Sequence, residues 1–196
     1  MGFTRAELEA FRDHTIDDLL GEDCRLLFVG INPGLWTAAT NTHFAHPGNR
    51  FYPALWRGGI TDRRLDPTGL GDEERAHLVS LGIGITNIVA RATARASELS
   101  NDELRMGGAT LVNRVAAVDP VVVAIVGITA YRTAYRLPRA ATGRQPPGQH
   151  PFGDTECWVV PNPSGLNAHA TVDTLAREYR QVAIAAGLRV GPVRPG

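Results

Sequence analysis

The sequence contains no lysine, so all twenty of its basic side chains are arginines. This absence excludes enzymes that form a Schiff base through a lysine amine, and it excludes the phosphate-binding lysine of a Walker-type loop. Cysteine is almost as rare: Cys24 and Cys157 each lie in or beside an apolar run, which predicts two buried thiols. Two cysteines cannot form a four-thiolate zinc or iron–sulfur site, and no two histidines are four residues apart. We therefore expect no metal and no cofactor.

Long hydrophobic runs are also missing. No segment approaches the length of a transmembrane helix, the N-terminus has no apolar signal region, and Ala6 does not fit a myristoylation motif. These absences predict a soluble, intracellular protein that does not bind membranes.

The formal net charge is zero, so no overall field draws the protein to nucleic acid. The charges are nevertheless unevenly distributed. Residues 1–24 contain seven acidic side chains against two arginines, whereas residues 104–153 contain six arginines and one acidic side chain. Such an arginine-rich face can follow a phosphate backbone weakly and with strong salt dependence, or it can simply be a solvated surface. Composition leaves both interpretations open.

Predicted strands and helices alternate along the 196 residues, without internal repeats. Apolar runs predict strands at 25–30, 84–89, 121–127 and 156–160. Helical spacing predicts helices at 4–20, 51–56, 72–80, 101–118, 129–136 and 172–186, with loops at 32–49 and 138–151. This order predicts an α/β fold, a single three-layer α/β/α domain around a central, mainly parallel sheet. We expect an N-terminal helical extension at 1–24, the main domain at 25–188 and a frayed tail at 189–196.

Two strand-to-loop junctions carry the most specific pattern. The apolar run at 26–29 ends in Gly30-Ile31-Asn32-Pro33-Gly34-Leu35, and the run at 157–160 ends in Pro161-Asn162-Pro163-Ser164-Gly165-Leu166. Each junction holds an Asn-Pro pair, a nearby glycine and free backbone N–H groups. Parallel strands end at a common edge of the sheet, where open α/β folds bind their ligands. The two junctions therefore predict one site built from both ends of the domain.

Two common interpretations of such junctions do not fit. The first loop lacks the third glycine of a dinucleotide-binding fingerprint, and no acidic residue follows about twenty residues later to bind a ribose. Ser164 stands in Asn-Pro-Ser-Gly and not in the G-x-S-x-G turn of a serine hydrolase.

A third segment, Phe44-Ala45-His46-Pro47-Gly48-Asn49-Arg50-Phe51, lies between the junctions. In this order and spacing, the three motifs resemble the mismatch-specific uracil/thymine-DNA glycosylase family, most of all its bacterial G:U mismatch-specific uracil-DNA glycosylase branch. The resemblance spans residues 25–186. It implies a domain that flips a base out of mismatched double-stranded DNA and hydrolyses the N-glycosidic bond, leaving an abasic site in base excision repair. It also implies a cytoplasmic, nucleoid-associated bacterial protein that acts as a monomer.

The resemblance assigns roles to residues around the base. Asn32 would hold the attacking water, which an amide can orient but cannot deprotonate, so we expect a slow enzyme. Phe44 would stack on the extruded base, a contact worth roughly 1–3 kcal/mol. Backbone N–H groups near Ile31 and Phe44, together with Asn162, would bind the base. The structural alternatives are that Asn32 only caps its own turn and that Phe44 is a core aromatic.

The same resemblance assigns a DNA-contacting loop. Leu166 would enter the space that the extruded nucleotide leaves, which offsets an unstacking cost of roughly a few kcal/mol. Ser164 and Gly165 would contact phosphate, and Asn167 would lie against the DNA. The structural alternative is that Leu166 merely begins the last helix.

The sequence departs from the family pattern at several positions. Asn167-Ala168-His169 replaces the Ser-Arg pair expected after the wedge leucine, and Trp36 and Thr37 replace small residues and should narrow the pocket. Asn87 stands where some relatives carry a lysine, which argues against xanthine removal. Without lysine, only the N-terminal amine could cut the DNA strand, so we expect a monofunctional enzyme.

Other functions stay open at this point. The same fold could serve as a non-catalytic DNA-damage-binding module, or as a small-molecule nucleotide-binding protein. A glycosylase could also prefer another lesion, such as thymine or ethenocytosine.

Overall fold

A five-stranded sheet in the order β2-β1-β3-β5-β4 forms the centre of the computed structural model, which describes residues 2–168 and 170–195. The parallel strands are β1 (Leu26–Gly30), β2 (Ile83–Asn87), β3 (Val122–Val126) and β5 (Glu156–Val160), and the short β4 (Gly143–Arg144) runs antiparallel to β5. In register, Leu27 of β1 is paired with Gly84 on one side and Val123 on the other. The predicted α/β class with a mainly parallel sheet is confirmed.

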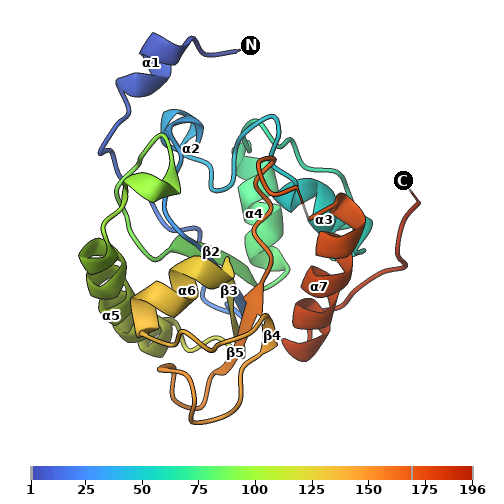
Figure 1. The fold of residues 1–196 in the computed structure, drawn as a ribbon. Helices are drawn as coiled ribbons and strands as arrows, with labels where there is room; N and C mark the ends of the chain where they lie inside the picture. The colour runs from blue at the N-terminus through green and yellow to red at the C-terminus, as the bar shows by residue number, and fades with distance from the viewer. Residues whose placement is uncertain (1, 169, 196) are drawn as a thin grey trace.

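Helices cover both faces of this sheet (Figure 1). One face packs against α3 (Phe51–Arg57), α4 (Asp72–Ser80) and α7 (Val172–Ala185), and the other against α5 (Asn101–Val118) and α6 (Ile128–Tyr135). Strand β1 shows why both faces need cover: Leu26 and Phe28 enter the first core, Leu27 and Val29 enter the second, and all four are fully buried. Both cysteine thiols are buried, as predicted.

The N-terminal segment differs from the helix expected at 4–20, because α1 covers only Arg5–Glu9. Asp13 has a left-handed φ of 64°, and Leu19 forms an antiparallel bridge with Ile85 of β2. Since β2 is an edge strand, this bridge shields one side of an otherwise open sheet edge. The apolar residues at 16–20 are therefore spaced for contact with the domain and do not form the face of a helix.

Two of the seven acidic residues of this segment are ion-paired with the body of the domain. Asp13 forms an ion pair with Arg91 (2.7 Å), and Asp18 forms one with Arg114 (3.1 Å) and accepts a hydrogen bond from the Thr86 hydroxyl. These two carboxylates therefore help to hold the segment against the domain.

The expected frayed tail is also wrong for the part of it that the structure describes. The N–H of Gly191 donates to the carbonyl of Gly59 (2.7 Å), and the Arg194 guanidinium donates to the carbonyl of Trp56 near the end of α3 (2.7 Å). The tail therefore caps α3. Two expected loops contain short elements as well: α2 (Leu35–Thr40) lies within 32–49, and β4 lies within 138–151.

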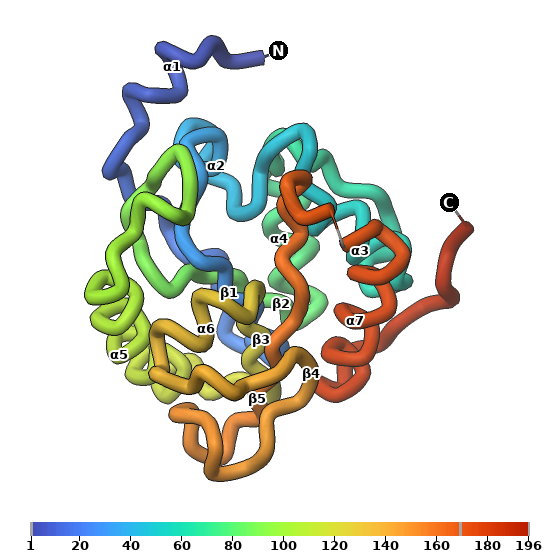
Figure 2. The backbone as a smooth tube through the Cα atoms, in the orientation of Figure 1, coloured from blue at the N-terminus to red at the C-terminus, as the bar shows by residue number. Residues whose placement is uncertain are grey.

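The carboxyl ends of the four parallel strands meet at one edge of the sheet. The loops that follow them gather there together with α2 and the short helix η1 (Ala96–Glu98), as the tube in Figure 2 shows. The two Asn-Pro junctions are thus brought to the same end of the molecule.

Candidate active site

A cleft of about 1350 Å³ opens at this edge of the sheet. Seven of the eight predicted site residues line it: Ile31, Asn32, Phe44, Asn162, Ser164, Gly165 and Leu166. The eighth, Asn167, belongs to the same loop but is not part of the lining, and its side chain instead donates to the carbonyl of Asn162 (3.0 Å). The two ends of the domain therefore contribute to one cavity.

The amide of Asn32 is oriented by the protein. Its nitrogen Nδ2 donates to the carbonyl oxygens of Pro33 (3.1 Å) and Arg91 (3.0 Å) and to the hydroxyl of Thr93 (2.8 Å). With the nitrogen held by these three acceptors, the carbonyl oxygen Oδ1 is the amide atom left for the cleft. No hydrogen bond joins Oδ1 to any other residue that the structure describes.

Phe44 forms an aromatic wall that is backed by the core. Its ring stacks on Phe51 with centroids 4.1 Å apart and an interplanar angle of 23°, and Phe51 itself is fully buried against Phe28 and Tyr179. The backbone of Phe44 has a left-handed φ of 56°, which is uncommon for a bulky residue. Phe44 is half-buried and lines the cleft, so part of its side chain is accessible to a ligand there.

Two backbone donors border the same cavity. Within the described part of the chain, the N–H groups of Ile31 and Phe44 donate to no backbone or side-chain acceptor. Uncompensated N–H groups in a partly buried cleft favour a ligand that carries carbonyl or anionic oxygens.

Asn87 and His43 form a buried pair beneath the cleft. Asn87 ends β2 and lines the cavity, and its Nδ2 lies 3.1 Å from Nδ1 of His43, whose Nε2 lies 3.0 Å from the carbonyl of Asp17. These partners fit a neutral ring that donates through Nε2 and accepts through Nδ1. Burial lowers the pKa of His43 to about 4, which keeps the ring neutral.

Gly30 has to be a glycine because of this pair. A Cβ added to Gly30 would lie 2.4 Å from Oδ1 of Asn87 and 3.4 Å from the ring of Phe44. The absence of a side chain therefore lets the amide and the ring approach the end of β1 from the same side.

The loop at 161–168 is shaped by hydrogen bonds of its own and by Arg50. Oδ1 of Asn162 accepts from the N–H of Ser164 (2.9 Å), so the amide side chain that was expected to bind a base also closes a turn. The Arg50 guanidinium donates to four carbonyl oxygens of the loop and its continuation: those of Ser164 (3.4 Å), Gly165 (3.3 Å), Asn167 (3.0 Å) and Ala170 (2.6 Å). His169, at the departure from the family pattern, lies outside the described residues.

Leu166 projects from this loop with 91% of its surface exposed. It precedes α7, which begins at Val172, so it does not start the last helix. Gly165 fits closely behind it, since an added Cβ would lie 2.7 Å from the carbonyl of Gly48. The loop thus presents an apolar side chain to solvent on a backbone that is packed tightly against Gly48.

Arg50 and His43 are functional candidates that sequence reasoning missed. Arg50 lies within the third motif and His43 directly precedes it, but nothing in the pattern showed that their partners are backbone atoms far away in the sequence. The departure at Trp36 is also explained in part, because its Nε1 donates to the carbonyl of Thr68 (2.9 Å) and its ring forms one wall of the cleft.

The cleft offers no unpaired carboxylate among the residues that the structure describes. The carboxylates that line it are Glu9 and Glu98, and both are ion-paired with Arg12. The hydrogen bond from Arg12 lowers the pKa of Glu98, so this group is ionised near neutral pH. Within the described ranges, no three His, Cys, Asp or Glu side chains gather into a potential metal site.

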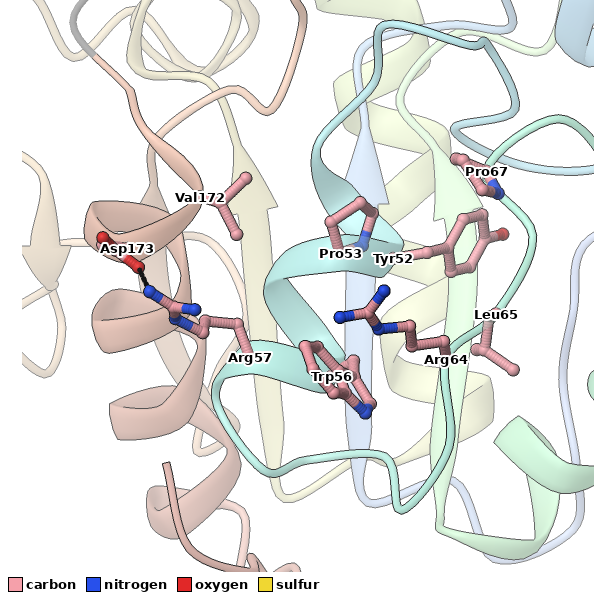
Figure 3. Close-up of a pocket in the computed structure, with 9 residues that line it drawn as sticks. All are labelled: Tyr52, Pro53, Trp56, Arg57, Arg64, Leu65, Pro67, Val172 and Asp173. Atoms are coloured by element: carbon pink, nitrogen blue, oxygen red, sulfur yellow. Dashed lines mark ion pairs between the residues drawn. The ribbon is translucent and has the colours of Figure 1, made fainter. Parts of the chain in front are cut away.

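A second cavity, of about 490 Å³, lies between α3, α7 and the segment at 64–67 (Figure 3). Its charged groups are already engaged: Arg57 pairs with Asp173 (2.6 Å), and the Arg64 guanidinium lies 4.1 Å from the centre of the Trp56 ring. It shares no lining residue with the cleft and contains none of the predicted site residues.

No helix in the described ranges is long and apolar enough to cross a bilayer.

Comparisons with known proteins agree with this geometry. A solution NMR structure from Methanosarcina acetivorans, provisionally described as a uracil DNA glycosylase, superimposes with a TM-score of 0.57 at 15% sequence identity. The match covers 87% of this chain and 98% of that one, and at this identity it shows a shared fold. A family profile described as the uracil DNA glycosylase superfamily matches residues 18–185, which include both junctions and the segment between them. The chain therefore belongs to the uracil DNA glycosylase superfamily.

Proposed function

We propose that this protein is a monofunctional, mismatch-specific uracil-DNA glycosylase of the bacterial G:U type. In this proposal it extrudes uracil, and related damaged pyrimidines, from mismatched duplex DNA and hydrolyses the N-glycosidic bond to leave an abasic site. The catalytic unit is residues 25–188, acting as a monomer without a metal or cofactor.

The orientation of Asn32 carries the proposal. Its nitrogen is held by three protein acceptors, which leaves Oδ1 to accept a hydrogen bond from a water in the cleft. Glycosidic cleavage builds positive charge on the sugar, so a positioned water is the required nucleophile. Because no unpaired carboxylate of the described chain lines the cleft to take the proton, we expect the chemical step to be slow.

The remaining groups suit an extruded pyrimidine. Phe44 would stack on one face of the base, while the unpaired N–H groups of Ile31 and Phe44 would bind its carbonyl oxygens and stabilise the departing anion. Asn87, whose amide is fixed by His43, would offer both a donor and an acceptor to the polar edge of the base. Asn162 would contribute to base binding through the turn that it closes, because this turn shapes the cleft beside the base.

The mismatch preference would come from the cost of extrusion. Leu166 is almost fully exposed on a loop that Arg50 holds, which suits a side chain that replaces the lost base in the stack. A G:U pair is less stable than a Watson–Crick pair, so it should open at lower cost. Ser164, Gly165 and Asn167 would contact the backbone next to this wedge.

The test is excision of uracil from a G:U duplex, followed by alkali to cleave the abasic site. Wild-type protein should give strand cleavage after alkali and none before it. Asn32→Ala should lower the single-turnover rate by about 100-fold or more, whereas Asn113→Ala, an exposed asparagine on α5, should keep the wild-type rate. Full activity in Asn32→Ala would remove the proposed role of this residue.

The second candidate is a non-catalytic damage-binding module on the same fold. The orientation of the Asn32 amide argues against a binding module, because binding alone does not need an acceptor oxygen left free for the base site. Tight binding to a G:U duplex without any alkali-labile product would favour this candidate.

A further inference from the structure

The cleft extends well beyond the site between Asn32 and Phe44. Its outer part is lined by Arg5, Leu8 and Arg12 of the N-terminal segment and by residues 93–98 around η1. The family profile starts at residue 18, so α1 is an addition to the matched domain. Figure 1 shows α1 at the same end of the molecule as α2 and the loops that follow the strands.

This N-terminal arm, residues 3–13, is held against the domain. An aromatic contact fixes its start, and ion pairs fix its end. These contacts join Phe3 to Trp36 (ring centroids 5.0 Å apart), Arg12 to Glu98, and Asp13 to Arg91 (2.7 Å). In addition, the N–H of Asp13 donates to the carbonyl of Ala92 (2.9 Å). These contacts hold the arm in place as one wall of the cleft.

The charges on this wall differ in what they are free to bind. Arg12 pairs with two carboxylates, Glu9 and Glu98, so this group carries one net negative charge. Arg5 and Arg95 also line the cleft, are exposed, and form no ion pair with any acidic residue that the structure describes. The Arg95 backbone is fixed by a hydrogen bond from its N–H to Glu98 (2.9 Å). Two unpaired guanidinium groups thus face the part of the cleft that a single base cannot fill.

We propose that Arg5 and Arg95 bind phosphates of the DNA strand that flanks the extruded nucleotide. The arm and η1 then form a second side of the DNA-binding groove, and residues 162–166 form the side already described. This inference rests on the proposed DNA substrate. A continuous strand is the occupant that fits, because the outer cleft is contiguous with the base site and its unpaired charges are positive.

The test measures DNA binding and not excision. The probe is a duplex with a stable abasic analogue opposite guanine, titrated by fluorescence anisotropy between about 50 and 200 mM salt. The magnitude of the negative slope of log K against log salt should decrease by about 0.9 in Arg5→Ala and in Arg95→Ala, and by about twice that in the double variant. Arg5→Lys should recover the slope, since lysine also neutralises a phosphate. Arg139→Ala, an exposed arginine outside the cleft, should bind like wild type.

The outcomes separate this inference from the proposed function. An unchanged slope in the double variant, with uracil excision intact in wild type, would overturn the role of the arm alone. A reduced slope in a protein that excises no uracil would keep the arm as a DNA contact and reject the glycosylase. A thermal melt of each variant serves as the folding control, and both arginines are exposed, so melting temperatures should stay near that of wild type.

Discussion

Acidification should destabilise this protein through one buried histidine. His43 is 5% exposed, and its neutral ring accepts from Asn87 and donates to the carbonyl of Asp17. Burial, with a smaller contribution from Arg75, lowers its pKa to about 4 against the opposing effects of the Asp17 carbonyl and the Asp18 carboxylate. Protonation would add a second donor where Asn87 already donates, so the folded state resists it.

The sign and size of the effect follow from linkage. A histidine in the unfolded chain has a pKa of about 6.5, so between about pH 6.5 and 4 the unfolded state binds a proton that the folded state does not. The free energy of unfolding therefore falls as the pH is lowered through this window and is fully retained above it. A gap of about 2.5 pKa units, at about 1.4 kcal/mol each, sets the loss at about 3 kcal/mol.

The assay is urea unfolding, followed by tryptophan fluorescence at several pH values, for wild type and His43→Gln. Glutamine keeps a donor and an acceptor but does not titrate, and every other ionisable group is common to both proteins. We expect the difference in unfolding free energy between them to shrink by about 3 kcal/mol from about pH 7 to pH 4. A difference that stays constant over this range would show that His43 titrates normally, and the fixed orientation of Asn87 would then lose its support.

Three further predictions concern the cleft and its loop. Leu166→Ala should slow excision from a G:U duplex roughly thirtyfold, equivalent to about 2 kcal/mol of lost apolar contact, with a much smaller effect on a single-stranded substrate. Arg50→Ala should lower the free energy of unfolding by about 2 kcal/mol in urea titrations, and Arg50→Lys should recover only part of it because an ammonium cannot span four carbonyls. Asn32→Asp should lower the melting temperature and bring no gain in single-turnover rate, because a carboxylate cannot donate to the three acceptors around Asn32.

The sequence was sufficient for the four parallel strands and the long helices, but not for β4. Helix α5 and strand β5 lie at their predicted bounds, because a capping Ser100 and a short apolar run, respectively, mark those bounds locally. The meeting of the two Asn-Pro junctions also followed from parallel topology alone, since the carboxyl ends of β1 and β5 must share an edge.

The errors arise where distant parts of the chain determine local structure. Residues 14–20 have helical spacing, yet Leu19 pairs with the edge of β2, a contact that no local pattern encodes. The tail after residue 188 is polar and rich in glycine and proline, yet Arg194 finds carbonyl acceptors at the end of α3. Arg50 and His43 were missed for the same reason, since each binds backbone atoms more than twenty residues away.

The amide at position 32 shows how structural and chemical demands can be divided within one side chain. Its nitrogen satisfies Pro33, Arg91 and Thr93, which joins the loop after β1 to the loop after β2. In the proposed function, its oxygen would accept a hydrogen bond from the attacking water. A carboxylate would be the stronger base, but at this position it would face the carbonyl oxygens of Pro33 and Arg91, and this repulsion would weaken the contact between the two loops. The hydrogen-bond partners at position 32 therefore favour an asparagine, even though the proposed reaction would be faster with a stronger base.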